Sequence, residues 1–259
     1  MLPIVGIRPL SGRTGTTLLM NLLGTCPEIA FDRRYPAEYR IASYLARTAS
    51  VMTEPFDDTR HQGVTDFFFG EASTLGPLPF TSDALEVGAW RPGLLRSMWS
   101  SASEAMLTVR PGARWYAEKL AVDETVLIDA GITVLRVDLV RDPRDLLASR
   151  RAFLAGGTEG WARDAEVVCA ELMSRIDELD HYPPEVRLRY EDLAGDLAGT
   201  AERLAADLGV ELRPEAVPRV EHHVTTTSVE ASIGRWHRDL TSGEVEALAP
   251  IVKRLGYAD

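Results

Sequence analysis

The stretch Gly12-Arg13-Thr14-Gly15-Thr16-Thr17 decides the fold expected for this chain of 259 residues. It follows a short apolar run, Leu2–Ile7, and precedes a stretch in which leucines recur at helical spacing. This order predicts a buried strand, a glycine-containing loop and a helix. Such a unit points backbone N–H groups and the positive end of a helix at one place, so the sequence predicts an anion-binding loop.

The loop departs at two positions from the phosphate-binding pattern G-x-x-x-x-G-K-[ST]. Leu10 stands in place of the first glycine, Thr16 stands in place of the lysine, and the cation of the loop is Arg13. The N–H groups of Gly15, Thr16 and Thr17, together with the threonine hydroxyls, are further donors for an anion. The missing lysine favours a donor with fewer phosphates than ATP. A tight turn capped by threonines is the alternative without a ligand.

Composition and charge limit the class of protein. The chain has 45% hydrophobic and 26% charged residues, as globular domains do, and a formal net charge of −11. This charge excludes general nucleic-acid binding, so an anionic ligand needs a local cationic pocket. Cys26 and Cys169 predict two reduced, buried thiols. We find no signal peptide and no apolar run of about 20 residues, which predicts a cytoplasmic protein without a membrane span.

Strand-like and helical stretches alternate along the chain. Thr133–Val140 and Val186–Tyr190 have the pattern of buried strands, and a helical stretch follows each. The alternation predicts an α/β fold of three layers, with a central, mainly parallel sheet flanked by helices, similar to the P-loop NTPase fold. The length favours a single domain over residues 1–259. Within it, residues 51–113 predict loops and short helices that form an inserted lid or acceptor-binding region.

A second polar cluster follows the strand 133–140. Arg141 ends this strand and therefore points towards the crevice in which open parallel sheets bind ligands. Asp142-Pro143 predicts the N-cap and the first residue of a helix. Ser149 lies roughly 10 Å into that helix, so it shares a phosphate with Arg141 only if the phosphate lies over the helix. The alternative is a surface ion pair between Arg141 and Asp145.

Two further segments combine aromatic and polar side chains. In Arg189-Tyr190-Glu191-Asp192-Leu193, the tyrosine can cover or hydrogen-bond a purine, or pack against the sheet. Ser232-Ile233-Gly234-Arg235-Trp236 is a loop that can close over a phosphate and a base, or one that a buried tryptophan anchors. The residues by themselves leave both alternatives open.

The four segments, in this order, resemble the sulfotransferases that use 3′-phosphoadenosine 5′-phosphosulfate (PAPS). The resemblance implies that the first loop cradles the phosphosulfate without magnesium, and that the later segments hold the 3′-phosphate and the adenine. PAPS has no third phosphate and has two separate anionic ends, which agrees with Thr16 and with the two arginines. The implied donor-binding residues are Arg13, Thr14, Gly15, Thr16, Thr17 and Leu18 at the phosphosulfate, Arg141, Ser149, Ser232, Gly234 and Arg235 at the 3′-phosphate, and Tyr190 near the adenine.

The resemblance also suggests the catalytic groups. It implies a general base at Glu38, within a predicted helix Tyr35–Arg47, where carbohydrate-directed and several bacterial relatives carry a glutamate. Lys119 resembles the lysine of a Lys-Thr-His segment in cytosolic relatives and, with Arg13, would stabilise the transferring group. No histidine follows Lys119, which favours the glutamate type. The alternatives are a surface carboxylate paired with an arginine and an ordinary surface lysine.

Histidines are the other candidate bases. They are His61, His222, His223 and His237. Adjacent histidines rarely share a metal, and His222-His223 has no acidic or cysteine partner at ligand spacing, so the sequence predicts no metal site.

The sequence therefore predicts a PAPS-dependent sulfotransferase. It would move a sulfuryl group by in-line displacement to a hydroxyl or amine of a small-molecule or carbohydrate acceptor, and release adenosine 3′,5′-bisphosphate. One alternative is a P-loop phosphotransferase, in which Asp138 would be the magnesium-binding aspartate. Another is a non-catalytic nucleotide-binding protein. The sequence leaves the acceptor and the oligomeric state open.

Overall fold

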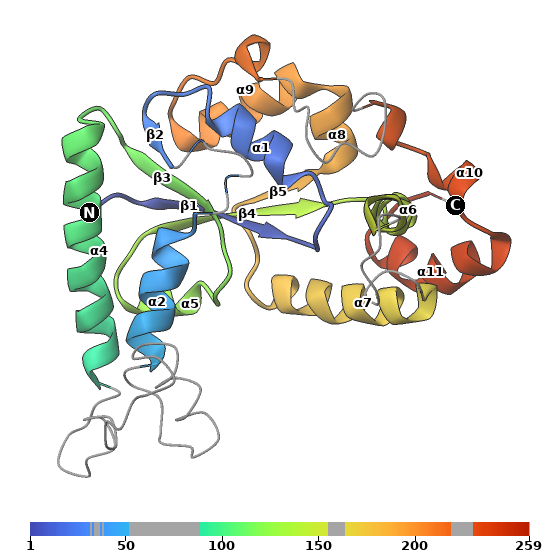
Figure 1. Cartoon of the computed structure of the whole chain (residues 1–259), viewed down its shortest axis with the longest axis horizontal. Helices are drawn as coiled ribbons and strands as arrows, with labels where there is room; N and C mark the ends of the chain where they lie inside the picture. The colour runs from blue at the N-terminus through green and yellow to red at the C-terminus, as the bar shows by residue number, and fades with distance from the viewer. Residues whose placement is uncertain are drawn as a thin grey trace.

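A parallel sheet forms the centre of the protein (Figure 1). The computed structural model describes residues 1–31, 33, 37, 39–51, 89–154, 164–218 and 230–258. Among these residues the strand order is β2-β3-β1-β4-β5, and every pairing is parallel, which confirms the predicted α/β class. The strands are β1 (Ile4–Pro9), β2 (Ile29–Ala30), β3 (Trp115–Lys119), β4 (Val134–Val140) and β5 (Val186–Arg189). Because parallel strands end at one edge, the loops after β1, β3, β4 and β5 meet there.

Helices cover both faces of the sheet, as the three-layer prediction requires (Figure 1). One face carries α1, α8 and α9, the other carries α2, α5 and α7, and α6, α10 and α11 lie towards the end of β4. The helices are α1 (Thr16–Leu23), α2 (Ile41–Val51), α4 (Trp90–Val109), α5 (Thr125–Asp129), α6 (Pro143–Leu154), α7 (Ala165–His181), α8 (Tyr190–Gly195), α9 (Leu197–Leu208), α10 (Trp236–Asp239) and α11 (Ser242–Arg254), with short 3-10 helices η3 (Pro214–Ala216) and η4 (Glu230–Ser232). None of the described helices is long and apolar enough to cross a bilayer.

The alternation of side chains along the strands divides the core between the two faces of the sheet. Val5 packs into the cluster under α1 and α9, whereas its neighbour Ile4 packs into the cluster with α4 and α5. A third cluster joins the end of β4 to α6, α7 and α11 through residues such as Val140, Leu172 and Ile251. This third cluster fixes α6 to the edge at which the strands end.

Several boundaries follow from local signals that the sequence displays. Asp142 caps α6, since its Oδ1 accepts the N–H of Arg144 at 2.9 Å. Gly209 ends α9 with a φ of 62°, and Gly256 lies just beyond α11 with a φ of 68°. In α7, apolar residues three or four positions apart form a stripe that is buried over its whole length: Ala165, Val168, Leu172, Ile176 and Leu179.

Two expectations were wrong, and long-range contacts explain both. The helix predicted over Tyr35–Arg47 begins only at Ile41 and continues to Val51, because side chains of β3 bind the backbone at its start. Residues 90–109, expected as loops and short helices, form the 20-residue helix α4. This helix buries only a narrow stripe, which leaves a weak helical pattern. Residues 52–88 lie outside the described residues, so the single domain and the lid role of residues 51–113 stay predictions.

Candidate active site

The loop 10–15 stands at the end of the central strand, between Pro9 and the first residue of α1. Arg13 has a φ of 72°, a left-handed conformation that costs about 1–2 kcal/mol in an L-residue. Hydrogen bonds within the loop offset this cost. The Ser11 N–H donates to Thr14 Oγ1 at 3.1 Å, and the Thr14 hydroxyl donates to the Ser11 carbonyl. The buried Thr14 side chain thus shapes the loop and is already engaged within it.

Gly15 lies against the ring of Tyr190, the first residue of α8. A Cβ at Gly15 would lie 2.2 Å from Tyr190 Cδ2, and the φ of Gly15 is 96°, so only glycine fits here. Behind it, α1 starts without a side-chain cap, while the Leu18 N–H bonds to the Gly15 carbonyl at 3.0 Å. The first N–H groups of α1 therefore point at the space before the helix, which suits an anion.

Arg141 connects this loop to the distant segment around Ser232. It is buried at the end of β4, its Nη1 donates to the Arg13 carbonyl at 2.9 Å, and its Nη2 donates to the Ser232 carbonyl at 2.8 Å. The guanidinium lies 4.3 Å from the centre of the Tyr190 ring. The buried Nε has no hydrogen-bond partner within the described ranges. Within the described residues Arg141 forms no ion pair with Asp145, so the surface-pair alternative does not describe its contacts.

The electrostatics around Arg141 favour an anion. Burial lowers the pKa of the Arg141 guanidinium, because a cation loses water there, and the nearby Asp145 acts against this shift. Asp145 is itself engaged, since its oxygens accept the Gly234 N–H at 2.6 Å and the Trp236 N–H at 3.0 Å. A bound anion would offset the cost of burying the guanidinium.

Ser149 and Arg13 meet at the other side of the loop. Arg13 Nε lies 3.4 Å from the Ser149 Oγ, and the guanidinium stacks 4.6 Å from the ring centre of Phe153. Both Ser149 and Phe153 come from α6, so this helix positions the cation of the loop. The fully buried Arg150 holds the loop as well, because it donates to the Ser11 hydroxyl and to Glu171 of α7. Arg150 is one of three arginines in α6, and no pattern in the sequence singles it out for this role.

The segment 230–236 closes the cluster. Tyr190 Oη and Ser232 Oγ are 2.7 Å apart, and Gly234 has a φ of 70°. Arg235 is bonded to Asp239 at 2.5 and 2.7 Å. The structure thus gathers residues from all four sequence segments around the loop 10–15, with Arg235 held in an ion pair.

The catalytic candidates are placed less completely. Glu38, His61, His222 and His223 lie outside the described residues, and His237 is exposed and stacked on Trp236. Lys119 is buried at the end of β3 and pairs in register with Ile7 of β1. Ile7 lies two residues before Pro9, where β1 ends and the loop 10–15 follows.

Glu118, next to Lys119, holds the start of α2. Its Oε2 accepts the Ala42 N–H at 2.8 Å, and its Oε1 accepts the Ser43 N–H at 2.9 Å and the Ser43 hydroxyl at 2.5 Å. The Ser43 Oγ in turn accepts the Ala121 N–H at 3.0 Å. Tyr116 Oη accepts the Ile41 N–H at 3.1 Å and donates to the Tyr39 carbonyl at 3.2 Å. We call these contacts the β3–α2 clamp.

The clamp joins the backbone directly after Glu38 to the residues flanking Lys119. Its members are separated by about 75 residues in sequence, so no local pattern announced it. Burial raises the pKa of the Glu118 carboxyl, and the donors of Ser43 and Ala42 counteract part of this shift.

Asp138, the aspartate considered for magnesium, is also engaged. Its Oδ1 accepts from Arg8 Nε at 2.8 Å and its Oδ2 from Arg187 Nη2 at 3.0 Å. Both carboxylate oxygens are bound by arginines, which disfavours the metal role of the phosphotransferase alternative. The described residues contain no group of three or more potential metal ligands.

The fold is P-loop-like and α/β, and a glycine-containing loop followed by an uncapped helix stands after the central strand. Residues 11–214 match the model of the sulfotransferase family, described as "Sulfotransferase family". The chain therefore belongs to the sulfotransferase family, whose reaction is sulfuryl transfer, and the resemblance inferred from the sequence is confirmed. No curated protein sequence matches it significantly.

Among the solved structures, one with a TM-score above 0.5 supports the fold, and two others are less similar. The sulfotransferase domain of the Synechococcus PCC 7002 olefin synthase is 17% identical, with a TM-score of 0.57 over 100% of this chain and 96% of that domain. Retinol dehydratase, in complex with androsterone and inactive cofactor PAP, is 16% identical, with a TM-score of 0.46 over 98% and 81% of the two chains. Sulfotransferase STF9 from Mycobacterium avium is 15% identical, with a TM-score of 0.44 over 98% and 76%.

Replacing Gly15 by alanine should disrupt the contact between the loop and α8. The new Cβ would overlap the Tyr190 ring and sit at an unfavourable φ. We expect the free energy of unfolding to fall by about 1–3 kcal/mol, which thermal unfolding would show as a lower midpoint. Gly195→Ala, in the same helix as Tyr190 but with open space around the added Cβ, is the control and should change little. Equal midpoints for the two variants would contradict the close approach.

The β3–α2 clamp makes stability depend on pH. Since the folded pKa of Glu118 lies above its ordinary value of 4.5, the folded state keeps the proton to higher pH than the unfolded chain. The free energy of unfolding should therefore fall as pH rises from 4.5 through the folded pKa. Glu118→Gln should remove this part of the pH dependence in urea titrations, whereas the exposed Glu104→Gln should keep it. Superimposable profiles for wild type and Glu118→Gln would refute the assignment.

Proposed function

We propose that this sulfotransferase uses PAPS as donor and transfers its sulfuryl group to a hydroxyl or amine of a small-molecule acceptor. The observation that carries the proposal is the convergence of Arg13, Ser149, Arg141, Tyr190 and Ser232 around one loop. These residues come from four separate segments, and the donor has two anionic ends and an aromatic base to satisfy. The structural relative retinol dehydratase was solved with PAP, which is consistent with this choice of donor.

The residues present fit such a donor. The uncapped start of α1 and the Arg13 guanidinium would hold the phosphosulfate at the loop 10–15. The buried Nε of Arg141 lacks an acceptor among the described residues, and a 3′-phosphate oxygen would supply one. Ser232 and Tyr190 lie beside it and would complete the 3′-phosphate and adenine sites. Arg235 would join only by leaving Asp239.

Transfer then consists of positioning and charge stabilisation. A lone pair of the acceptor oxygen forms the new O–S bond, while the bond from sulfur to the bridging oxygen of the 5′-phosphate breaks. Arg13, Lys119 and the N–H groups at the start of α1 would stabilise the negative charge on the leaving phosphate. The carboxylate of Glu38 would take the acceptor proton. The products are the sulfated acceptor and adenosine 3′,5′-bisphosphate. The cytoplasmic location expected from the sequence stays a prediction.

Arg141 should distinguish ligands by their 3′-phosphate. In Arg141→Lys, which keeps the charge but loses the planar fork, adenosine 3′,5′-bisphosphate should bind about tenfold to a hundredfold more weakly in calorimetry. Adenosine 5′-phosphate, which lacks the 3′ group, should lose much less. Circular dichroism and thermal unfolding verify that the variant is folded. Tighter binding of ATP than of the bisphosphate by the wild-type protein would overturn the donor assignment and revive the phosphotransferase alternative.

Glu38 should affect turnover without affecting donor affinity. Glu38→Gln removes the proton acceptor but keeps the size of the side chain, so kcat should fall by roughly 10²–10⁴-fold. The Kd for adenosine 3′,5′-bisphosphate should stay within about twofold, since the donor site is intact. Transfer of ³⁵S from labelled PAPS measures kcat, with Glu28→Gln as a control on a carboxylate just before β2, at the edge where the strands begin. Unchanged turnover would clear Glu38 of the base role.

A further inference from the structure

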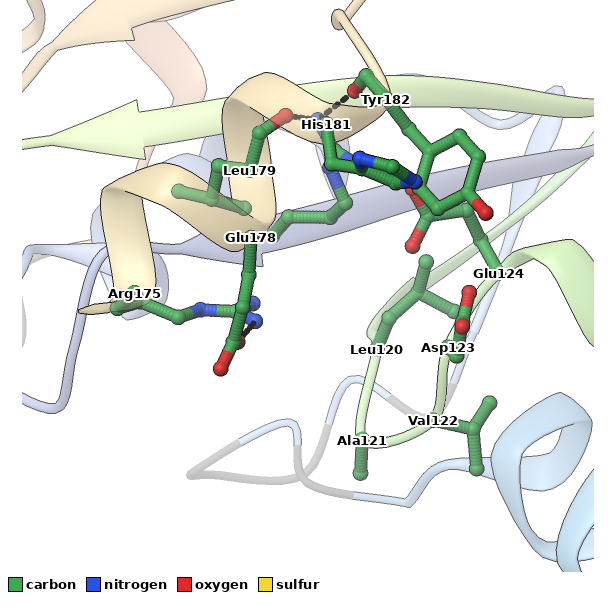
Figure 2. Close-up of a pocket in the computed structure, with 11 residues that line it drawn as sticks. Leu120, Ala121, Val122, Asp123, Glu124, Arg175, Glu178, Leu179, His181 and Tyr182 are labelled. Atoms are coloured by element: carbon green, nitrogen blue, oxygen red, sulfur yellow. Dashed lines mark hydrogen bonds and ion pairs between the residues drawn. The ribbon is translucent and has the colours of Figure 1, made fainter.

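A cavity of about 700 Å³ opens beside the candidate active site. One wall is the loop 120–124 after β3, and the other is formed by residues 175–182 at the end of α7 (Figure 2). Figure 2 shows the side chains of Leu120 and Tyr182 turned towards the space between these walls. A volume of this size is in the range that holds a small organic molecule.

Arg8 of β1 joins the two walls. Its guanidinium forms ion pairs with Glu124 on one side and with Asp138 of β4, and it donates to the carbonyls of Leu179 and Tyr182 on the other. Arg8 is 2% exposed, so the cavity is built on a buried cation that is already engaged. Because these bonds are already made, Arg8 supports the walls and does not attract an anion.

Each of the arginines and carboxylates that line the cavity already has a partner. Glu124 is paired with Arg8, Glu178 with Arg175, and Asp123 accepts from the backbone and hydroxyl of Thr125. Two arginines stand against three carboxylates among the described lining residues. The remaining surface comes from Leu120, Ala121, Val122, Leu179 and the rings of His181 and Tyr182, which lie edge to face. Both lining arginines are already paired with carboxylates, so an additional negative charge would find no unpaired arginine among these residues, whereas an apolar body would find complementary surface.

The position of the cavity suits the direction of attack. The residues proposed to hold the nucleotide follow β4 and β5, on one side of β1, while the loop 120–124 follows β3, on the other side. In-line displacement requires the attacking oxygen and the leaving oxygen to lie on opposite sides of the sulfur. With the phosphosulfate at the loop after β1 and its nucleotide extending towards β4 and β5, an acceptor on the opposite side of the sulfur would come from the β3 side. Arg175 of the cavity wall reaches the Pro9 carbonyl at 3.4 Å, immediately before that loop.

We infer that this cavity binds the acceptor, and that the acceptor is a neutral, partly apolar alcohol or phenol rather than an anionic carbohydrate. The inference rests on the proposed function. The acceptor hydroxyl would enter past Leu120, next to Lys119, and its oxygen would form the bond to sulfur as its proton passes to the base.

The experiment fills the cavity and varies the charge of the acceptor. Ala121 is exposed at the cavity wall, so Ala121→Trp introduces bulk there without replacing a buried residue. The control is Ala206→Trp, an equally exposed alanine in a second cavity beside α9. The probes are 2-naphthol and its carboxylated analogue 6-hydroxy-2-naphthoic acid, assayed by transfer of ³⁵S from labelled PAPS. Calorimetry with adenosine 3′,5′-bisphosphate monitors the donor site.

The expected result has three parts. The wild-type protein sulfates 2-naphthol with a kcat/KM at least tenfold above that for the anionic analogue. Ala121→Trp raises the KM for 2-naphthol at least tenfold, while Ala206→Trp leaves it within twofold. Both variants bind the bisphosphate as the wild type does.

Other results overturn the inference in distinguishable ways. Preference for the anionic analogue, or transfer to neither probe while the bisphosphate still binds, refutes the acceptor class and leaves the donor site standing. An unchanged KM in Ala121→Trp refutes the cavity. If the wild-type protein does not bind the bisphosphate at all, the proposed function is refuted instead.

Discussion

The candidate site depends on one buried guanidinium. The guanidinium of Arg141 is buried at the end of β4. It donates to the backbone carbonyls of Arg13 and Ser232, which are more than 200 residues apart in sequence. Tyr190 covers its face. Burying a cation in this way is unfavourable unless its surroundings return the lost hydration. The two carbonyls and the Tyr190 ring replace part of the lost hydration, and a dianionic ligand would replace more. We therefore expect ligand binding to be coupled to the ordering of these loops.

The supporting contacts explain how a chain with a net charge of −11 can hold an anion. Carboxylates near the site are engaged in structural work: Asp145 accepts backbone N–H groups, Glu171 pairs with Arg150, and Asp138 lies between two arginines. The potential at the loop 10–15 is then set by nearby cations and helix N–H groups more than by the distant surface, which solvent screens.

Much of the fold was predictable because its signals are local. The glycine loop, the Asp142 cap and the Gly209 stop are readable within a few residues. The position of Arg141 at a strand end also predicted that it would face the crevice at the sheet edge, where it bonds to the carbonyl of Arg13, since parallel strands end at a common edge. The start of α2 was not predictable in this way, because Tyr116 and Glu118 impose it from β3. The bonds of the Thr14 hydroxyl to the Ser11 carbonyl and of Arg235 to Asp239 were not predictable either, since each depends on how one particular side chain is oriented.

The buried Arg8 has a consequence for how such an enzyme can diversify. It fastens the loop 120–124 only through Glu124 and fastens α7 only through backbone carbonyls. The identity of the exposed Ala121 carries none of this attachment. Mutations at this position can accumulate without loosening the scaffold, so evolution or a protein engineer can retune which molecules are accepted while the machinery for the donor is inherited intact.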